Sequence, residues 1–204
     1  MIVIVDYGLG NLRSVAGAVE RVGFEPLISN RVSDFEASDK LILAGVGAFG
    51  DGMANLENFG VVDALNEQVQ SQEKLILGIC LGAQLMGRES YEFGRHQGLG
   101  WIDATVKKLE PADVSLRLPH IGWNDFFRVG RNPLLTDVPE EALFYYVHSY
   151  HIDCDDQSIV FGKCEYGMEF TAAFQQGNIY GTQFHPEKSQ LHGLTLLKNF
   201  LELG

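Results

Sequence analysis

One stretch of the chain reads Leu75-Ile76-Leu77-Gly78-Ile79-Cys80-Leu81-Gly82-Ala83-Gln84. It begins as an apolar strand and passes into a helical pattern at Cys80. Gly78 and Gly82 flank Cys80 two residues away on either side, as glycines flank the serine in the sharp strand-to-helix turn of hydrolases. Such a turn holds the thiol outward, exposed and strained, and the start of the helix favours the thiolate. The stretch therefore predicts an α/β fold that presents a cysteine nucleophile.

Length and composition limit the classes of protein to consider. The chain has 204 residues, 46% of them hydrophobic, which is enough for a buried core and predicts a single domain over residues 1–204. A formal net charge of −12 argues against a nucleic-acid partner, because phosphate binding needs clustered Lys and Arg. The three cysteines are an odd number, and the segment Met1–Asp6 has neither a basic flank nor a long apolar run. We therefore expect no signal peptide, no membrane span and a reducing cytoplasm that keeps Cys80 free.

Short apolar runs alternate with helical stretches in the first half of the chain, which is typical of a parallel sheet covered by helices on both faces. Strands are expected at 1–5, 25–28, 40–43 and 74–79, and helices at 12–22 and 61–72. In the C-terminal half, strands are expected at 143–147, 158–164, 169–175 and 178–184. A tight Gln176-Gly177 turn makes the last two a hairpin, and leucines at helical spacing after residue 190 predict a closing helix. The expected fold is thus a mostly parallel sheet with an antiparallel section in the C-terminal half.

A cysteine nucleophile needs a base, and His185 is the best placed of the six histidines. It directly follows a predicted strand, and Glu187 comes two residues later, with Pro186 stiffening the step between them. An imidazole oriented by Glu187 can pair with the Cys80 thiolate and then deliver a proton to a leaving amine. We therefore predict a catalytic triad of Cys80, His185 and Glu187.

Several segments resemble the class I, or triad, glutamine amidotransferases. Two of them are Gly78-Ile79-Cys80-Leu81-Gly82-Ala83-Gln84 and His185-Pro186-Glu187. Others narrow the resemblance to the glutaminase subunits of imidazole glycerol phosphate synthases: Asp6-Tyr7-Gly8-Leu9-Gly10-Asn11-Leu12, Gly45-Val46-Gly47-Ala48-Phe49, Pro119-His120-Ile121-Gly122-Trp123-Asn124, Val147-His148-Ser149-Tyr150 and Tyr180-Gly181-Thr182-Gln183-Phe184-His185-Pro186-Glu187-Lys188-Ser189. The similarity runs from the first strand to the last helix.

The resemblance implies a flavodoxin-like sheet and a definite chemistry. Glutamine would be hydrolysed through a thioester on Cys80, and the ammonia would pass to a (β/α)8-barrel cyclase subunit in a heterodimer. There it would enter imidazole glycerol phosphate formation in histidine biosynthesis. Neither a metal nor an organic cofactor is implied.

The resemblance also implies roles for individual residues. The amide attacked by the thiolate becomes an oxyanion, for which Leu81 N–H, just past the nucleophile, and Val46 N–H are the expected donors. The ends of the bound glutamine would be held by Gly47, Gln84, Glu92, Ser149 and Tyr150. The residues expected to face the partner are Lys188, Trp123, His120, Asn124 and Tyr145.

Two alternatives rest on single motifs. Gly45-Val46-Gly47-Ala48-Phe49-Gly50 fits the G-x-G-x-x-G pattern of dinucleotide-binding proteins, but Asp51-Gly52 puts a carboxylate and a helix breaker where a pyrophosphate needs a helix N-terminus. A metal site could be drawn from His148, His151, Cys154 and Cys164. The first two would point to opposite faces of a continuing strand, and the chain has no C-x-x-C pair, so neither alternative is favoured.

Two further alternatives concern the partner. A cysteine hydrolase or peptidase on the same fold would act alone, with no ammonia acceptor. A paralogous amidotransferase subunit would serve amidation in surface-sugar synthesis, which the sequence hardly separates from the histidine pathway.

Ala44 stands where the family usually has proline, and Ala83 where it usually has methionine. Losing the proline frees the backbone before Gly45, so we expect a looser oxyanion loop and weaker control by the partner. Ala44→Pro should therefore raise the ratio of glutaminase activity with the synthase partner to activity without it, by about two- to fivefold. The measurement compares both ratios for the wild type and the variant, and unchanged ratios would remove the hypothesis.

Overall fold

Continuous apolar runs in the first strands build one large sheet at the centre of the molecule. The structure, a computed structural model, describes residues 1–204. Eight strands form the sheet in the spatial order β2-β1-β3-β4-β14-β13-β12-β9. Their bounds are β1 Ile2–Val5, β2 Pro26–Ser29, β3 Lys40–Gly45, β4 Leu75–Cys80, β9 Phe127–Arg128, β12 Val160–Glu165, β13 Glu169–Gln176 and β14 Ile179–Thr182. The strands from β2 to β14 pair in parallel and those from β14 to β9 antiparallel, which confirms the predicted fold class.

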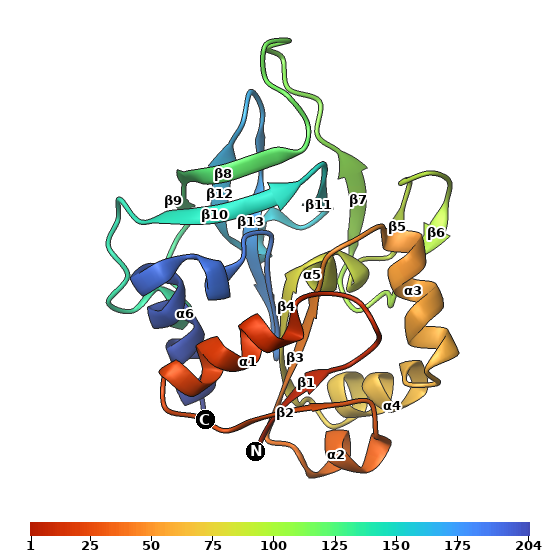
Figure 1. The fold of residues 1–204 in the computed structure, drawn as a ribbon. Coiled ribbons are helices and arrows are strands. Elements are labelled where there is room, and N and C mark those ends of the chain that lie inside the picture. The colour runs from red at the N-terminus through yellow and green to blue at the C-terminus, as the bar shows by residue number, and fades with distance from the viewer.

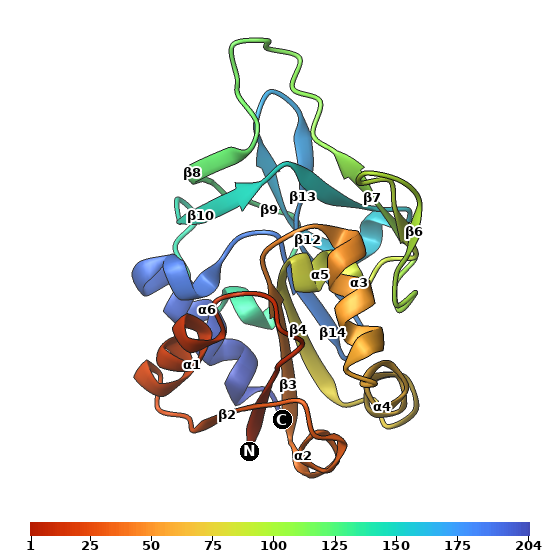
Figure 2. The same cartoon turned by 45° about the vertical axis from the view of Figure 1, so that its right-hand side comes forward.

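Two smaller sheets lie beyond the carboxyl ends of the parallel strands, at the top of the molecule as drawn (Figures 1 and 2). One pairs β8 (His120–Asp125) with β10 (Leu143–His148). The other has the order β11-β7-β5-β6, with bounds β5 Glu89–Ser90, β6 His96–Gln97, β7 Ala104–Lys108 and β11 Tyr150–Cys154. The sequence predicts β10 but not β5 to β9 or β11. Three of these strands have only two residues, too few for a period, and β8 contains Gly, Asn and Asp, which are rare in strands.

Helices cover both faces of the large sheet. Their bounds are α1 Leu12–Arg21, α2 Val32–Ala37, α3 Phe49–Asn58, α4 Val62–Asn66, α5 Leu81–Leu85 and α6 Gln190–Glu202. α1 and α6 lie side by side on one face, while α3 and α4 lie on the other (Figures 1 and 2). None of these helices has both the length and the apolar character needed to cross a membrane.

The two faces of the sheet belong to two separate cores. In β1, Ile2 and Ile4 pack with α1 and α6, whereas Val3 and Val5 pack with α3 and α4. Successive side chains of a strand point to opposite faces, so a strand covered on both sides must be apolar at every position. This requirement explains the continuous apolar runs from which the parallel strands are predicted.

Some predicted elements differ from the structure in extent or identity. The helix expected at 61–72 consists of α4 and a π-helical turn, Glu67–Ser71. α2 and α3 are not predicted, and treating Gly52 as a helix breaker is wrong, because α3 passes through it. A Cβ at Gly52 would lie 3.0 Å from Leu85 Cδ2, so a larger residue there would press on the Leu85 side chain where α3 packs on α5.

The end of the chain follows the prediction closely. β13 and β14 form the expected hairpin, with Gln176 opposite Ile179 and Gly177 at φ +57° in the turn. α6 then closes the fold and buries Leu197 and Leu201 against the sheet. The hairpin places the segment that follows β14 directly beside the end of β4.

The junction between β4 and α5 is packed too tightly for side chains. A Cβ at Gly82 would lie 1.7 Å from the Leu43 carbonyl oxygen, and one at Gly78 would lie 2.6 Å from Ala83 Cα. The glycines therefore let the first turn of α5 approach the backbone of β3 directly. The position of Cys80 follows from this contact.

Gly82→Ala is expected to destabilise the fold by more than about 2 kcal/mol, because the new methyl group must displace the β3 backbone. Gly17→Ala is the matched control. Gly17 lies inside α1 with no atom within 4 Å of an added Cβ, so this change should stabilise by about 0.5–1 kcal/mol. Urea unfolding of both variants measures the difference, and equal stabilities would contradict the packing argument.

Candidate active site

Cys80 lies where β4 ends and α5 begins. Its φ of 53° and ψ of −110° form a conformation that non-glycine residues adopt only under constraint. Its sulfur lies 3.8 Å from the Val147 carbonyl oxygen and accepts a hydrogen bond from Gln183 Nε2 at 3.6 Å. The predicted backbone strain is confirmed, but the predicted exposure is wrong. Cys80 is only 5% exposed, since Val147 and Gln183 lie against the sulfur.

His185 and Glu187 form a buried pair in the segment after β14. His185 Nδ1 lies 2.8 Å from Glu187 Oε1, and both side chains are almost fully buried. A carboxylate can only accept a hydrogen bond, so His185 Nδ1 carries a proton and donates a hydrogen bond to Glu187 Oε1. Nε2 makes no hydrogen bond within the protein and is the nitrogen left for Cys80 and a substrate.

The charges around His185 set its protonation state. Burial disfavours the imidazolium, but the Cys80 thiolate and the Glu187 carboxylate favour it more strongly, and the pKa of His185 rises to about 10. The charge of the Cys80 thiolate raises the pKa of the His185 ring, although Nε2 makes no hydrogen bond of good geometry. Both neighbours therefore favour the protonated form of His185.

Sheet topology explains how residues far apart in the sequence meet here. β14 pairs in parallel with β4, and Thr182 lies opposite Ile79. The carboxyl ends of parallel neighbours lie at the same edge of a sheet, so the segments that carry Cys80 and His185 leave the sheet together.

A narrow pocket of about 50 Å³ opens beside Cys80. Val46, Gly47 and Leu81 line it at the ends of β3 and β4, where Gly45 lies opposite Cys80. The other predicted glutamine-binding residues line the same pocket: Gln84, Glu92, Ser149 and Tyr150. The structure thus brings every residue expected for the oxyanion and the glutamine into one place.

Hydrogen bonds between side chains hold this pocket in shape. Gln84 Nε2 donates to the Tyr150 carbonyl oxygen at 2.7 Å and to Gln183 Oε1 at 3.0 Å. Glu92 Oε2 accepts from Phe49 N–H at 2.7 Å, and burial raises the pKa of Glu92 although this bond opposes the shift. The sequence does not predict a role for Gln183. Its place two residues before His185 is the only signal, since its link to both Cys80 and Gln84 depends on the fold.

A model of the glutamine amidotransferase class-I family matches residues 3–203. The chain belongs to the class-I glutamine amidotransferases.

Named relatives of this amidotransferase are similar over their whole length. The imidazole glycerol phosphate synthase subunit HisH 1 of Campylobacter jejuni (strain RM1221) is 46% identical and covers 100% of both chains. The subunit HisH 2 of Pseudomonas aeruginosa PAO1 is 45% identical with the same coverage, and HisH of Aquifex aeolicus is 44% identical over 97% of this chain and 94% of its own.

Solved structures show the same fold at lower identity. A crystal structure of a glutamine amidotransferase superposes with a TM-score of 0.77 at 20% identity, covering 99% of this chain and 98% of its own. The structure of PurLQS from Thermotoga maritima gives a TM-score of 0.73 at 20% identity, covering 98% and 96%.

Behind the pocket, the amidotransferase contains a chain of hydrogen-bonded histidines. His148 Nδ1 lies 2.9 Å from the Tyr150 carbonyl oxygen, His120 Nδ1 lies 3.2 Å from His148 Nε2, and Asn124 Nδ2 lies 3.2 Å from His120 Nε2. A carbonyl only accepts, so His148 donates to Tyr150 and its Nε2 accepts from His120, which in turn accepts from Asn124. Burial lowers the pKa of His120 to about 4 and that of His148 to about 3, and both rings are neutral.

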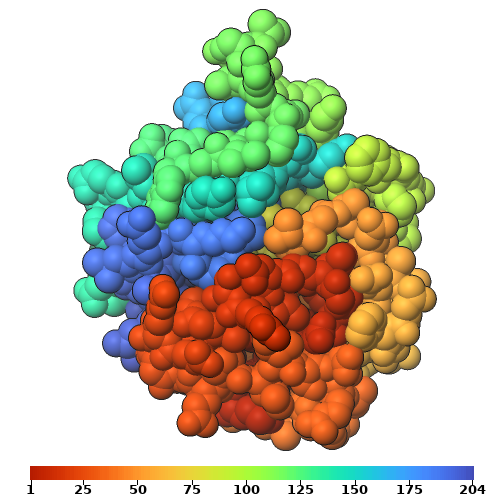
Figure 3. Space-filling model, viewed as in Figure 1, coloured from red at the N-terminus to blue at the C-terminus, as the bar shows by residue number.

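The residues expected to face the partner fall into two groups. Trp123 is 44% exposed and stands beside Tyr145, with ring centroids 6.1 Å apart, and Lys188 Nζ lies 5.8 Å from the Tyr145 ring centroid. The segments of β8, β10 and the start of α6 form one continuous surface around them (Figure 3). His120 is only 3% exposed and stacks on Tyr166, so it lies beneath this surface. Alternation along β8 turns it inward, opposite to Trp123.

The structure argues against a dinucleotide site at the glycine-rich loop, although Gly52 does not break the helix that follows the loop. α3 does begin after the glycine-rich loop, but its first N–H, from Phe49, is already bonded to the Glu92 carboxylate. A pyrophosphate would meet a negative charge at this helix terminus.

The metal alternative lacks a ligand set. His148 ends β10, while His151 and Cys154 lie in β11 and Cys164 in β12. No three His, Cys, Asp or Glu side chains converge as metal ligands.

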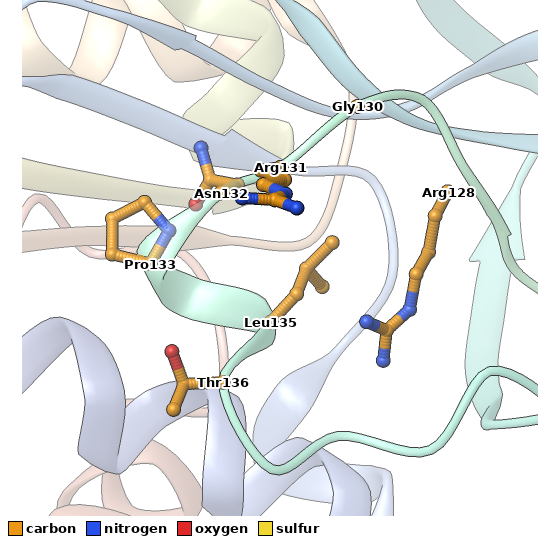
Figure 4. A pocket seen from close by; sticks show the side chains of 7 residues that line it. All are labelled: Arg128, Gly130, Arg131, Asn132, Pro133, Leu135 and Thr136. Atoms are coloured by element: carbon orange, nitrogen blue, oxygen red, sulfur yellow. The ribbon is translucent and has the colours of Figure 1, made fainter.

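A larger hollow lies between β9 and the short helix Pro133–Leu135. It has a volume of about 410 Å³, and the guanidinium groups of Arg128 and Arg131 point into it beside Leu135 (Figure 4). It contains none of the predicted site residues.

Lowering the pH from 7 to 5.5 should destabilise the amidotransferase through His120 and His148. The unfolded chain takes up protons below about pH 6.5, whereas both folded rings stay neutral, so each costs on the order of 1 kcal/mol. His185 acts in the opposite sense, because its raised pKa gives stability that is fully present below pH 6.5, but this gain is smaller.

Urea midpoints at the two pH values measure the loss. His120→Phe keeps a ring that can stack on Tyr166 but cannot titrate, and it should remove about 1 kcal/mol of the pH dependence of the unfolding free energy. The same dependence in the variant would show that His120 does not contribute.

Proposed function

We propose that this chain hydrolyses L-glutamine to glutamate and ammonia through a thioester on Cys80. It passes the ammonia to a (β/α)8-barrel cyclase subunit for imidazole glycerol phosphate formation in histidine biosynthesis. The observation that carries the chemistry is Cys80 at the strained β4–α5 junction beside the buried His185–Glu187 pair. Relatives named as subunits of imidazole glycerol phosphate synthase support the pathway.

In the first half of the reaction the Cys80 thiolate attacks the side-chain amide carbon of glutamine. The C=O π electrons move to oxygen, and the oxyanion is stabilised by Leu81 N–H and Val46 N–H. His185 Nε2 gives its proton to the amide nitrogen, the C–N bond breaks and ammonia leaves. The product is a glutamyl thioester on Cys80.

In the second half water replaces the thiolate. The neutral His185 accepts a proton from water at Nε2 as the oxygen attacks the thioester carbon. The C–S bond breaks, the thiolate returns and glutamate leaves. Glu187 keeps the Nδ1 proton in place throughout and offsets the charge of the imidazolium.

Different residues of the pocket would contact different parts of the bound glutamine. Gly47, with φ +137°, lets the backbone pass close to the substrate, and Glu92 offers a carboxylate to the α-ammonium group. Gln84, Ser149 and Tyr150 complete the wall from α5 and the β10–β11 junction. Burial and an existing bond to Phe49 N–H hold Glu92 in place before substrate arrives.

The cyclase would dock on the surface around Trp123 and Tyr145, with Lys188 and Asn124 at its edges. His120 would support this surface from below. Apolar side chains exposed near Trp123 favour a protein partner here: Ile121, Phe127, Leu143 and Leu191. Lys188 directly follows the Glu187 turn, so a subunit bound here would cover the site from which ammonia leaves. A reducing cytoplasm would keep the three buried cysteines as free thiols.

Cys80→Ala should abolish ammonia production from glutamine, while the complex with the cyclase still makes product from added ammonium salts. The reason is that the acceptor site lies on the other subunit. Cys154→Ala removes an equally buried thiol far along β11 and should retain glutaminase activity. Retained glutaminase activity in Cys80→Ala would refute the assignment.

The same assays separate the alternatives. Glutaminase activity that is negligible alone and rises with a cyclase excludes a free-standing hydrolase. Activation by a sugar-modifying enzyme in place of the cyclase would assign the chain to surface-sugar synthesis.

A further inference from the structure

Tyr7 carries a buried hydroxyl with no hydrogen-bond partner. The side chain is 0% exposed, and its oxygen is among the few buried side-chain polar atoms without a partner. A buried hydroxyl is normally hydrogen-bonded, so an unpaired one indicates a group that is paired in another state of the molecule.

The hydroxyl lies against the oxyanion loop. A Cβ built on Gly45 would lie 1.9 Å from the Tyr7 oxygen and 3.3 Å from Leu81 Cβ, so the hydroxyl is in contact with the Gly45 backbone. Gly45 lies opposite Cys80 across β3 and β4. Burial, and then the charge of the Cys80 thiolate, raise the pKa of Tyr7, so the hydroxyl keeps its proton at neutral pH.

Tyr7 cannot turn its hydroxyl elsewhere. Its carbonyl oxygen accepts from Asn55 Nδ2 at 2.9 Å, which ties it to α3, and its ring is enclosed by the core on that face. The loop that follows Tyr7 also touches the end of β3, since a Cβ at Gly10 would lie 3.0 Å from Gly45 Cα. The hydroxyl is thus fixed in place, whereas Gly45 and Gly47 leave the backbone around Val46 free to rotate.

We propose that Tyr7 is a positioning residue for the oxyanion site, whose hydroxyl donates a hydrogen bond to the Gly45 carbonyl oxygen when Val46 N–H turns toward the reacting amide. This inference rests on the proposed function. The carbonyl and N–H of one peptide unit point in opposite directions, so turning Val46 N–H toward Cys80 sends the Gly45 oxygen toward the other side of the loop. The unpaired Tyr7 hydroxyl, in contact with the Gly45 backbone, is the donor available to that oxygen.

Tyr7→Phe tests the proposal because it removes only the hydroxyl. We expect kcat for glutamine hydrolysis to fall by about three- to tenfold, the range of one neutral hydrogen bond, with KM unchanged within about twofold. The melting temperature should stay the same or rise, because the resting state loses only an unpaired group. A purely structural role would instead lower the melting temperature together with the activity.

Tyr146→Phe is the matched control. Tyr146 also has a fully buried hydroxyl without a partner, but this oxygen lies near Cys164 rather than Gly45. Its removal should leave kcat unchanged. An equal loss of activity in both variants, or none in Tyr7→Phe, would overturn the proposal.

A second measurement distinguishes an effect of Tyr7→Phe on the oxyanion loop from an effect on the Cys80 thiol. Iodoacetamide alkylates Cys80 without forming an oxyanion, so its rate and pH profile should be the same for wild type and Tyr7→Phe. A parallel fall in alkylation would place the effect on the sulfur and overturn the assignment to the loop. If the wild type lacks glutaminase activity even in the complex with the cyclase, the proposed function fails, whereas an active wild-type complex with an equally active Tyr7→Phe complex contradicts this inference alone.

Discussion

Backbone contact between the first turn of α5 and the end of β3 is the constraint on which the site depends. Gly82 allows it, since any Cβ there would collide with the Leu43 carbonyl. With α5 drawn this close, the chain can leave β4 only by a sharp turn, and Cys80 takes a strained left-handed φ. The same closeness places Val46, Gly47 and Leu81 around one pocket beside Cys80. A looser junction would lose the position of Cys80 and the shape of this pocket together.

Burial makes this geometry effective and also costly. Burial disfavours the protonated form of His185, and the charges of Cys80 and Glu187 on either side of the ring offset this cost. Around these charges, polar groups that stay neutral keep the shape of the pocket. Gln183 forms hydrogen bonds with both Cys80 and Gln84. The Tyr150 carbonyl oxygen accepts hydrogen bonds from Gln84 and His148. Neutral donors of fixed direction orient the pocket without adding another buried charge.

The histidine chain and Tyr7 reach the pocket from different segments of the chain. The histidine chain begins at Asn124 in β8 and ends at the Tyr150 carbonyl oxygen. Tyr7 lies in the loop after β1, and its hydroxyl contacts Gly45 at the end of β3. Asn124 lies on the same face of β8 as His120, which is turned inward, so the histidine chain lies beneath the Trp123 surface. Tyr7, in contrast, is held within the core beside α3.

By itself the sequence determined the parallel strands, the Cys80 turn, the closing helix and the pairing of His185 with Glu187. All of these are local: apolar runs, flanking glycines and a two-residue spacing report on the nearest neighbours in the chain. Only the tertiary structure decided that Cys80 is buried, that Gln183 joins the site, that His120 lies beneath the surface and that the Tyr7 hydroxyl meets Gly45. These features depend on contacts between segments that lie far apart along the chain, and no pattern within one segment encodes the distance to another.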